Sequence, residues 1–226
     1  VTSIPPGVDH RFFNPGAGCE GVNQMLDIPP DAPVVLYAGG FDKSATIDAL
    51  LEAILLCLGS RPALRFVLAC RIRSRYERAR QRQVMQWTRT SRARGHVIVK
   101  EEVGDMRSLI ARADVCILPL YHTYGKLDLP LFLLEAMAMA KPIVTTDIAP
   151  LTELLEEPIG VAVQRDNAEA LAQGIEQMLV NGRCYGMIGR RTVEKKYAMP
   201  KIAEQYEDLY SKLLYEKHPA SIRPVE

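Results

Sequence analysis

Val34-Val35-Leu36-Tyr37-Ala38 is a short apolar run that Gly39-Gly40 closes, and Thr46–Leu58 continues from it with apolar residues at helical spacing. The same alternation of a short apolar run and a helical pattern recurs along the chain. The further runs that we predict to be strands are Leu64–Cys70, Val97–Lys100, Val115–Leu118, Pro142–Thr146 and Gly160–Val163. Strands that are apolar throughout are typical of a parallel sheet covered by helices on both faces. We therefore expect an α/β fold with a doubly wound, Rossmann-like sheet.

Helical patterns fill the remaining segments. Besides Thr46–Leu58 we predict helices at Ser74–Arg92, Met106–Ala113, Pro130–Ala140, Leu151–Glu156, Ala168–Val180, Arg183–Tyr197 and Lys201–Glu216. The predicted organisation is a leading segment at 1–30 that packs on the domain, the Rossmann-like domain at 31–182, extra C-terminal helices at 183–217 and a frayed tail at 218–226.

Length and composition limit the function classes. The chain has 226 residues, of which 48% are hydrophobic and 24% charged, so disorder is excluded and a sizeable core is expected. Two full Rossmann-sized domains do not fit this length. The chain begins at Val1 rather than Met, which suggests an excised or processed piece. No apolar run reaches the length of a membrane span, and no signal-peptide pattern opens the chain.

Cysteines and histidines give no metal-binding pattern. The five cysteines show no CxxC spacing, and three of them (Cys57, Cys70 and Cys116) lie inside apolar runs. We interpret them as buried, reduced thiols of a cytoplasmic protein. The four histidines are scattered, so we expect neither a metal nor a cofactor.

Positive charge is concentrated in one segment. The net charge is only +1, which gives no overall attraction to nucleic acid. Arg71–Arg94 nevertheless holds nine arginines against a single acid, Glu77. The segment is either a solvated helix face or a surface that binds an anionic membrane or another polyanion. If it binds a partner, we expect peripheral contact with a membrane and no binding of nucleic acid.

Ligands of doubly wound sheets bind beyond the carboxyl ends of the strands. The loops that fall there are Gly39–Ala45, Arg71–Ser74, Glu101–Asp105 and Leu120–Pro130. Gly39-Gly40 before a helix lets backbone amides approach a phosphate, although a plain tight turn explains the pair equally well.

The last of these loops leads into a helix that Pro130 is suited to open. The amides of its first turn are available to an anion. Glu135 lies among apolar residues, where a carboxylate needs partners such as ribose hydroxyls; the alternative is a glutamate at the rim of an apolar helix. Asp128 either contacts a ligand hydroxyl or is an acid favoured by the helix dipole.

These segments, in this order, resemble the C-terminal donor-binding domain of GT-B glycosyltransferases of the group 1 family. The specific match is Leu133-Leu134-Glu135-Ala136-Met137-Ala138-Met139-Ala140-Lys141-Pro142-Ile143-Val144. Weaker matches are Ile4–Asp9, Val103–Asp105, Ala113–Pro119, Glu153 and Tyr197–Leu214. The resemblance covers nearly the whole chain.

The resemblance implies binding of a nucleotide-diphosphate sugar. Asp128 and Glu135 are the acids it places at the transfer site, with Glu135 also holding the ribose. It further implies that the first-turn amides of Leu131 and Phe132 meet the diphosphate, that Lys100 and Glu101 lie near the base, and that the loop with His122 and Tyr124 lies near the sugar. Gly39, Gly40, Lys43 and Arg71 complete the expected donor-binding set.

Two departures from the family pattern matter. The family's first acid would stand eight residues before Glu135, where this chain has Leu127, with Asp128 one residue further on. The family's basic pair aligns with Gly40 and Ala45, so both cations are replaced; Lys43 or Arg71, each just beyond a strand, is a candidate to substitute.

The leading hypothesis is therefore the donor half of a hexosyl-type glycosyltransferase that works with retention in polysaccharide or glycoconjugate biosynthesis. The acceptor-binding N-terminal domain is absent from this length and would be supplied by the same protein or a partner chain, so the isolated chain is expected to be inactive. The alternatives are a non-catalytic sugar-nucleotide-binding module and a GT-B-type sugar-nucleotide epimerase.

Overall fold

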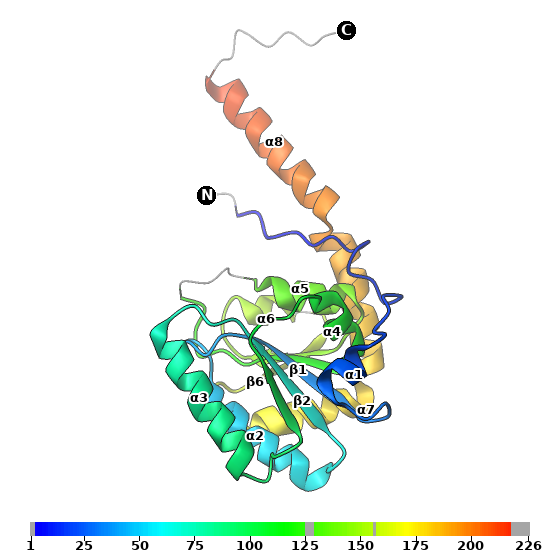
Figure 1. The fold of residues 1–226 in the computed structure, drawn as a ribbon. Coiled ribbons are helices and arrows are strands. Elements are labelled where there is room, and N and C mark those ends of the chain that lie inside the picture. Colours follow the sequence, from blue (N-terminus) through cyan, green and yellow to red (C-terminus); the bar gives the residue numbers. More distant parts are fainter. Residues whose placement is uncertain (1–2, 125–128, 156, 218–226) are drawn as a thin grey trace.

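A computed structural model of the chain describes residues 3–124, 129–155 and 157–217. Its centre is a sheet of six strands, all parallel, in the order β3-β2-β1-β4-β5-β6 (Figure 1). The strands are β1 Val34–Gly39, β2 Arg65–Cys70, β3 Val97–Lys100, β4 Val115–Leu118, β5 Ile143–Thr146 and β6 Gly160–Val163. The doubly wound, Rossmann-like fold is confirmed, and each predicted strand is found to within one residue at either end.

The order of the strands reverses between β1 and β4. Val35 of β1 pairs with Phe66 of β2 on one side and with Val115 of β4 on the other. From β1 the chain winds outward to β3, then returns to the centre and winds outward again to β6. A crevice opens at such a reversal because the connections leave in opposite directions.

Helices cover both faces of the sheet. They are α1 Val22–Leu26, α2 Ile47–Ser60, α3 Arg75–Thr90, α4 Met106–Arg112, α5 Leu131–Ala138, α6 Leu151–Leu154, α7 Ala168–Thr192, the π-helical turn η1 Val193–Tyr197 and α8 Met199–Lys217. Figure 1 shows α2, α3 and the first part of α7 on one side of the sheet, and α4, α5 and α6 on the other. Side-chain caps fix where three of them begin, with Ser74, Asp105 and Asn167 each accepting from a backbone N–H three residues later.

The core follows the central strands. All four residues from Val34 to Tyr37 are fully buried, as are the residues of β4 apart from a trace of exposure at Leu118. The cysteines in the described chain are free thiols, and the three predicted to be buried are buried. Burial raises the pKa of Cys57 and Cys116 to about 12 in each case, so these thiols stay protonated.

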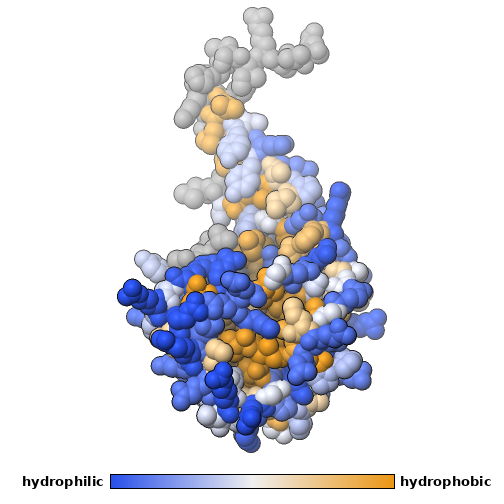
Figure 2. Space-filling view, in the orientation of Figure 1, coloured by the Kyte–Doolittle hydropathy of each residue, from blue (hydrophilic) through white to orange (hydrophobic). Residues whose placement is uncertain are grey.

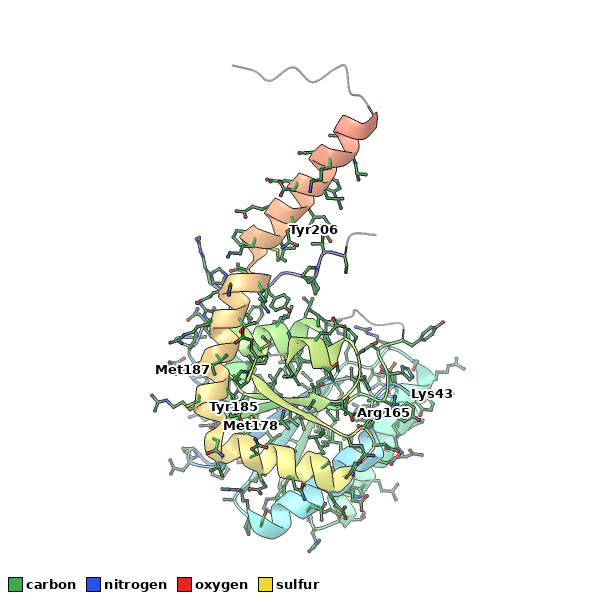
Figure 3. All side chains as sticks on the ribbon, turned by 180° about the vertical axis from the view of Figure 1, so that it is seen from behind. Lys43, Arg165, Met178, Tyr185, Met187 and Tyr206 are labelled. Atoms are coloured by element: carbon green, nitrogen blue, oxygen red, sulfur yellow. The ribbon has the colours of Figure 1, made fainter. Side chains whose placement is uncertain are left out.

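The prediction of two helices at Ala168–Val180 and Arg183–Tyr197 is wrong. One helix, α7, runs through Asn181 and Gly182, so the predicted domain boundary at 182 falls inside it. Figure 3 shows α7 changing direction between the labelled Met178 and Tyr185, the segment that contains this pair. A Cβ on Gly182 would lie 2.5 Å from Cγ of Pro142. The glycine therefore allows close packing of a bent helix and does not end it.

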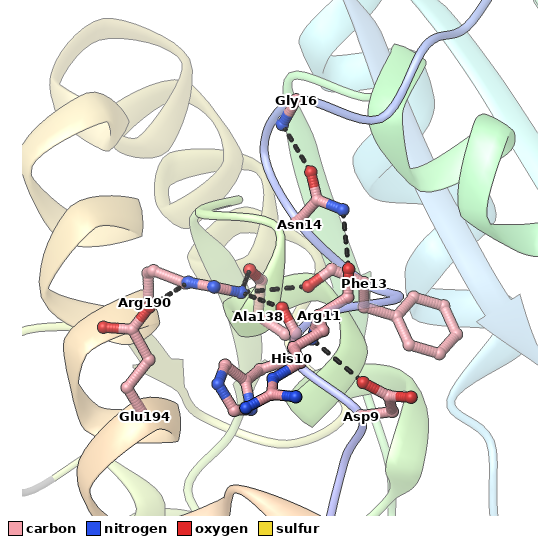
Figure 4. Close-up of polar contacts among 9 residues, drawn as sticks. All are labelled: Asp9, His10, Arg11, Phe13, Asn14, Gly16, Ala138, Arg190 and Glu194. Carbon is pink, nitrogen blue, oxygen red and sulfur yellow. Dashed lines mark hydrogen bonds and ion pairs between the residues drawn. The ribbon is translucent and has the colours of Figure 1, made fainter.

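The leading segment makes backbone hydrogen bonds with the C-terminal part of the chain. The N–H of Val8 donates to the carbonyl of Tyr197, and the N–H of Met199 donates back to Val8. Figure 4 shows Arg190 of α7 reaching the carbonyl oxygens of His10, Phe13 and Ala138. This guanidinium joins the start of the chain to the end of α5 and to α7.

Helix α8 runs away from the rest of the molecule (Figure 1). Ile202 near its start is buried, whereas Tyr206, Tyr210, Leu213 and Leu214 are exposed. Within the residues described, no helix is both long enough and apolar enough to cross a membrane. The predicted tail at 218–226 lies outside the described residues.

Candidate functional site

A pocket of about 550 Å³ lies at the carboxyl edge of the sheet, where the strand order reverses. All four loops expected from the sequence contribute to its wall. The lining residues are Ala38, Gly39, Gly40, Asp42, Ala69, Arg71, Arg73, Glu77, Glu101, Val103, Met106, Leu118, Leu120, Pro130, Leu131, Phe132 and Glu135. A volume in this range is typical of small-molecule sites.

The turn after β1 is held in shape by Tyr37. Its buried hydroxyl donates to the carbonyl of Gly40 at 2.7 Å, and burial raises its pKa well above the ordinary value. A Cβ on Gly39 would lie 2.5 Å from this hydroxyl, so only glycine fits. Asp42 accepts from the backbone N–H of Ser44 at 2.8 Å and turns the chain toward α2. Gly39, the last residue of β1, and Gly40 thus line the pocket and lead into the turn that the N–H of Ala45 closes on the carbonyl of Asp42.

The loop after β2 supplies the cations. Arg71 and Arg73 line the pocket from this loop, and neither forms an ion pair within the described chain. Glu77 is buried beneath them, where it accepts from the backbone N–H of Arg73 at 3.0 Å and from the hydroxyl of Ser74 at 3.3 Å. The N-terminal cap region of α3 therefore fixes the backbone at Arg73, two residues after Arg71.

An ion pair crosses from α3 to the loop after β3. Nη1 of Arg78 lies 2.6 Å from Oε2 of Glu101, and this hydrogen bond is the largest cause of a lowered Glu101 pKa. Glu101 therefore lines the pocket as a carboxylate that is already partnered. Its expected role near the base of the donor stays a prediction.

The start of α5 offers unbonded donors. Pro130 is the N-cap and provides no side-chain cap, and the N–H of Leu133 is already bonded to its carbonyl at 3.0 Å. The amides of Leu131 and Phe132 have no hydrogen-bond partner among the described residues, and both residues line the pocket. Such a helix start attracts anions.

One turn further along α5, Glu135 lies half-buried in the pocket wall. Burial raises the pKa of its carboxyl group, and this carboxyl group has no hydrogen bond or ion pair within the described chain. A carboxylate in this condition is costly to the free protein and is ready to accept hydrogen bonds from a ligand.

Several expected site residues lie apart from the pocket wall. Lys43 (labelled in Figure 3) does not line the cavity, and its Nζ lies 5.8 Å from the centre of the Tyr76 ring on α3. Lys100 ends β3 and does not line the cavity either. His122 and Tyr124 lie in the loop after β4, with ring centres 6.4 Å apart. Asp128 lies outside the described residues.

His122 is nevertheless unusual. Its Nδ1 is buried and has no hydrogen-bond partner in the described chain, while the neighbouring Tyr124 is 89% exposed. The loop is held by Ser44, whose carbonyl accepts from the N–H of Tyr121 at 2.7 Å. These contacts keep the loop beside the turn that follows β1.

Sequence reasoning did not find three charged residues of the wall, Asp42, Arg73 and Glu77. Arg73 could have been predicted from the sequence, because it belongs to a loop after a strand, Arg71–Ser74, that was already expected to contribute to the site. The role of Glu77 could also have been predicted. It is the third helical residue after the N-cap Ser74, which is the spacing of a capping box. Within the described residues no group of three metal-ligating side chains comes together.

A six-stranded parallel sheet with a pocket at its point of reversal, lined by Arg71 and Arg73, defines the molecule as a doubly wound α/β domain. Residues 32–181 match the family described as "Glycosyl transferases group 1", and the chain belongs to that family. Its fold is that of the C-terminal domain of GT-B enzymes.

Individual relatives are distant. Alpha-maltose-1-phosphate synthase of Mycobacterium tuberculosis is 24% identical over 235 residues, which cover 94% of this chain and 57% of the relative. The structure of sucrose-phosphate synthase from Thermosynechococcus elongatus has 25% identity and a TM-score of 0.79, covering 94% of this chain and 52% of that one. Anabaena HepE, solved in complex with UDP and glucose, has 16% identity and a TM-score of 0.78, covering 91% and 55%. The chain thus spans little more than half the length of these proteins.

Proposed function

We propose that this chain is the donor-binding half of a retaining glycosyltransferase and holds a nucleoside-diphosphate sugar in the pocket. One observation carries the proposal: an unpartnered, half-buried carboxylate, two unpaired arginines and two free helix amides face the same cavity. A nucleotide offers a complementary group to each of them. HepE, which shares this fold, has been solved with UDP-glucose.

The diphosphate takes the positive side of the pocket. Arg71 and Arg73 are the cations among the described lining residues, and the amides of Leu131 and Phe132 face the same space. The positions of the family's basic pair cannot serve, since Gly40 has no side chain and Ala45 has only an uncharged methyl group. The two arginines replace the missing charge, which argues against a module that has lost binding.

The nucleoside takes the acidic side. Glu135 accepts hydrogen bonds from the two ribose hydroxyls, which gives its carboxylate the partners it lacks in the free protein. The base lies toward the loop after β3, near Lys100 and Glu101. The hexose lies toward the loop after β4, near His122 and Tyr124. Glu135 and Asp128, the latter outside the described residues, are the acids that we propose for the transfer site.

Transfer then requires little covalent work from the protein. The bond between the anomeric carbon and the β-phosphate oxygen breaks, and a bond from the acceptor oxygen forms on the same face. The acceptor proton passes to the departing phosphate. Arg71, Arg73 and the start of α5 stabilise the negative charge that grows on the leaving diphosphate.

The acceptor half lies outside this chain. The chain spans little more than half of its relatives, and the exposed apolar residues of α8 are available to a second domain or partner chain. We therefore expect this chain alone to bind the donor and not to transfer it. We place the activity in the cytoplasm, in polysaccharide or glycoconjugate synthesis, because the buried cysteines are free thiols.

Binding of UDP, GDP, ADP and TDP and their hexose derivatives, measured by calorimetry, tests the proposal. At least one should bind, and Glu135→Gln should weaken that binding. Glu153→Gln is the matched control, because Glu153 is an exposed glutamate on α6 outside the pocket wall. Binding of none of these ligands would overturn the proposal. Product analysis with the complete enzyme separates transfer to an acceptor from epimerisation of the sugar nucleotide.

A further inference from the structure

The charge of the molecule is strongly divided. Arg71–Arg94 carries nine arginines and one acid, whereas the other residues hold nineteen lysines and arginines against twenty-six acids. A chain with a net charge of +1 therefore consists of one strongly basic segment and an acidic remainder. Such a separation orients a protein in an electric field.

The structure gathers this charge on one side of α3. Arg75, Arg78, Arg82 and Arg89 are spaced by three, four and seven residues, so they form one stripe along a helix of 16 residues. We call these four residues the α3 basic face. All four are exposed, and Figure 2 shows strongly hydrophilic residues along the side where Figure 1 draws α3.

Little of this charge is neutralised inside the molecule. Among the nine arginines, ion pairs within the described chain are limited to Arg78 with Glu101 and Arg80 with Asp48. The acid of the segment, Glu77, is buried and turned toward the cap of the helix. Arg75, Arg82 and Arg89 therefore point to solvent without a partner in the described residues.

We propose that the α3 basic face binds the surface of an anionic lipid membrane. The face is a straight row from Arg75 to Arg89 on one helix, about 21 Å long at 1.5 Å per residue, which suits a flat layer of negative headgroups. Each basic residue near such a surface strengthens partition roughly fivefold. The apolar side of α3 is buried against the domain at Val84, so the helix lies on the membrane without inserting.

A nucleic acid fits this face less well. Binding of single strands relies on aromatic side chains between the cations. The exposed aromatic of α3, Tyr76, lies under Lys43, and Trp87 is half-buried in the domain. The four residues of the face include no stacking group.

The α3 basic face lies close to the pocket along the chain. α3 begins at Arg75, directly after the loop that carries Arg71 and Arg73 into the pocket. A membrane held by the α3 basic face therefore lies next to the loop that lines the pocket. This places donor binding close to acceptors that are anchored in the same surface.

Co-sedimentation with vesicles tests the proposal. The protein should bind vesicles of phosphatidylglycerol and phosphatidylcholine in equal parts and should not bind phosphatidylcholine alone. Raising the salt from about 0.1 M to about 1 M should release it. The triple variant R75E/R82E/R89E, which leaves the Arg78–Glu101 pair intact, should lower the partition coefficient at least about 100-fold.

The matched control is R183E/R191E/K195E. It makes the same change in net charge at exposed positions on α7 and η1, away from α3 in Figure 1, and should change partition less than about threefold. Equal loss in both triples would overturn the proposal, as would binding that survives R75E/R82E/R89E. Binding to RNA without binding to mixed vesicles would overturn it too. Thermal unfolding of each variant confirms that the comparison is made on folded protein.

Discussion

The guanidinium of Arg190 donates a hydrogen bond to the carbonyl oxygen of Ala138, the last residue of α5, at a distance of 2.6 Å (Figure 4). The same nitrogen donates to His10 at 2.7 Å and to Phe13 at 3.0 Å, while Nε pairs with Glu194. Because α5 carries the pocket amides at its other end, this contact helps to hold the site in place.

We expect Arg190→Met to lower the free energy of unfolding by about 2–3 kcal/mol, because three carbonyl oxygens lose a charged donor. Urea unfolding followed by circular dichroism measures the loss. Arg191→Met is the control: Arg191 is exposed and makes none of these contacts, so its change should stay within about 0.5 kcal/mol. Equal effects of the two substitutions would contradict the role given to Arg190.

Glycines on α7 and α2 should respond to the same substitution with opposite signs. A Cβ on Gly186 would lie 1.9 Å from the backbone oxygen of Ala140, whereas a Cβ on Gly59 would meet nothing within 4 Å. Gly186→Ala should therefore destabilise the protein by about 2 kcal/mol or more. Gly59→Ala should stabilise it by about 0.5–1 kcal/mol, since it removes unfolded-state entropy. Thermal unfolding of the two variants checks the signs, and a stable Gly186→Ala variant would refute the close approach.

The sheet could be predicted from the sequence because its strands are buried on both sides. Apolar runs such as Val115–Leu118 carry that signal in their composition, and strand position then fixes which loops meet at one edge. Helix ends were harder. The pair Asn181-Gly182 has the composition of a helix stop, but the contact of Gly182 with Pro142, distant in sequence, keeps α7 continuous.

The location of the pocket could be predicted from the sequence, but only some of the side chains that line it could. Glu135 stood out because a carboxylate among apolar residues needs a partner. Arg73 lines the pocket from a backbone that the buried Glu77 holds, a contact that spacing alone does not reveal. Lys43 was predicted to bind the donor, but it lies over Tyr76, a residue that becomes its neighbour only in the folded chain.

The pH dependence of stability should show how much the buried, ionised carboxylate of Glu135 destabilises the folded protein. Burial raises the pKa of this carboxyl above its ordinary value of 4.5, so the folded state holds the proton more tightly than the unfolded state. Stability is therefore lost as the pH rises through the folded pKa. Glutamine stays neutral, so Glu135→Gln should unfold about 1 °C higher than the wild type at pH 7, a small gain because the group is partly solvated.

That gain should vanish below the ordinary pKa, where the wild-type carboxyl is protonated in both states. Thermal scans of both proteins between pH 4 and pH 8 measure the difference, at about one scan per pH unit. A variant that is less stable than the wild type at pH 7 would show that Glu135 has a partner in the free protein. The same variant should bind the nucleotide more weakly, which would separate stability from function.

The contribution of the loop after β2 to binding can be measured separately by comparing a ligand that carries a diphosphate with one that does not. Arg71 and Arg73 face the pocket, whereas Lys43 lies over Tyr76. Arg71→Gln and Arg73→Gln should each weaken binding of the preferred nucleoside diphosphate by about 10-fold or more, the effect of losing a charge-assisted hydrogen bond. Binding of the corresponding nucleoside, which has no phosphate, should stay within about twofold, because Glu135 is intact.

Lys43→Gln should leave both affinities unchanged, and calorimetry of the three variants with the two ligands gives the comparison. If Lys43→Gln weakens the diphosphate as much as Arg71→Gln does, the positive charge of the site comes from the loop after β1, and the assignment to the loop after β2 is wrong.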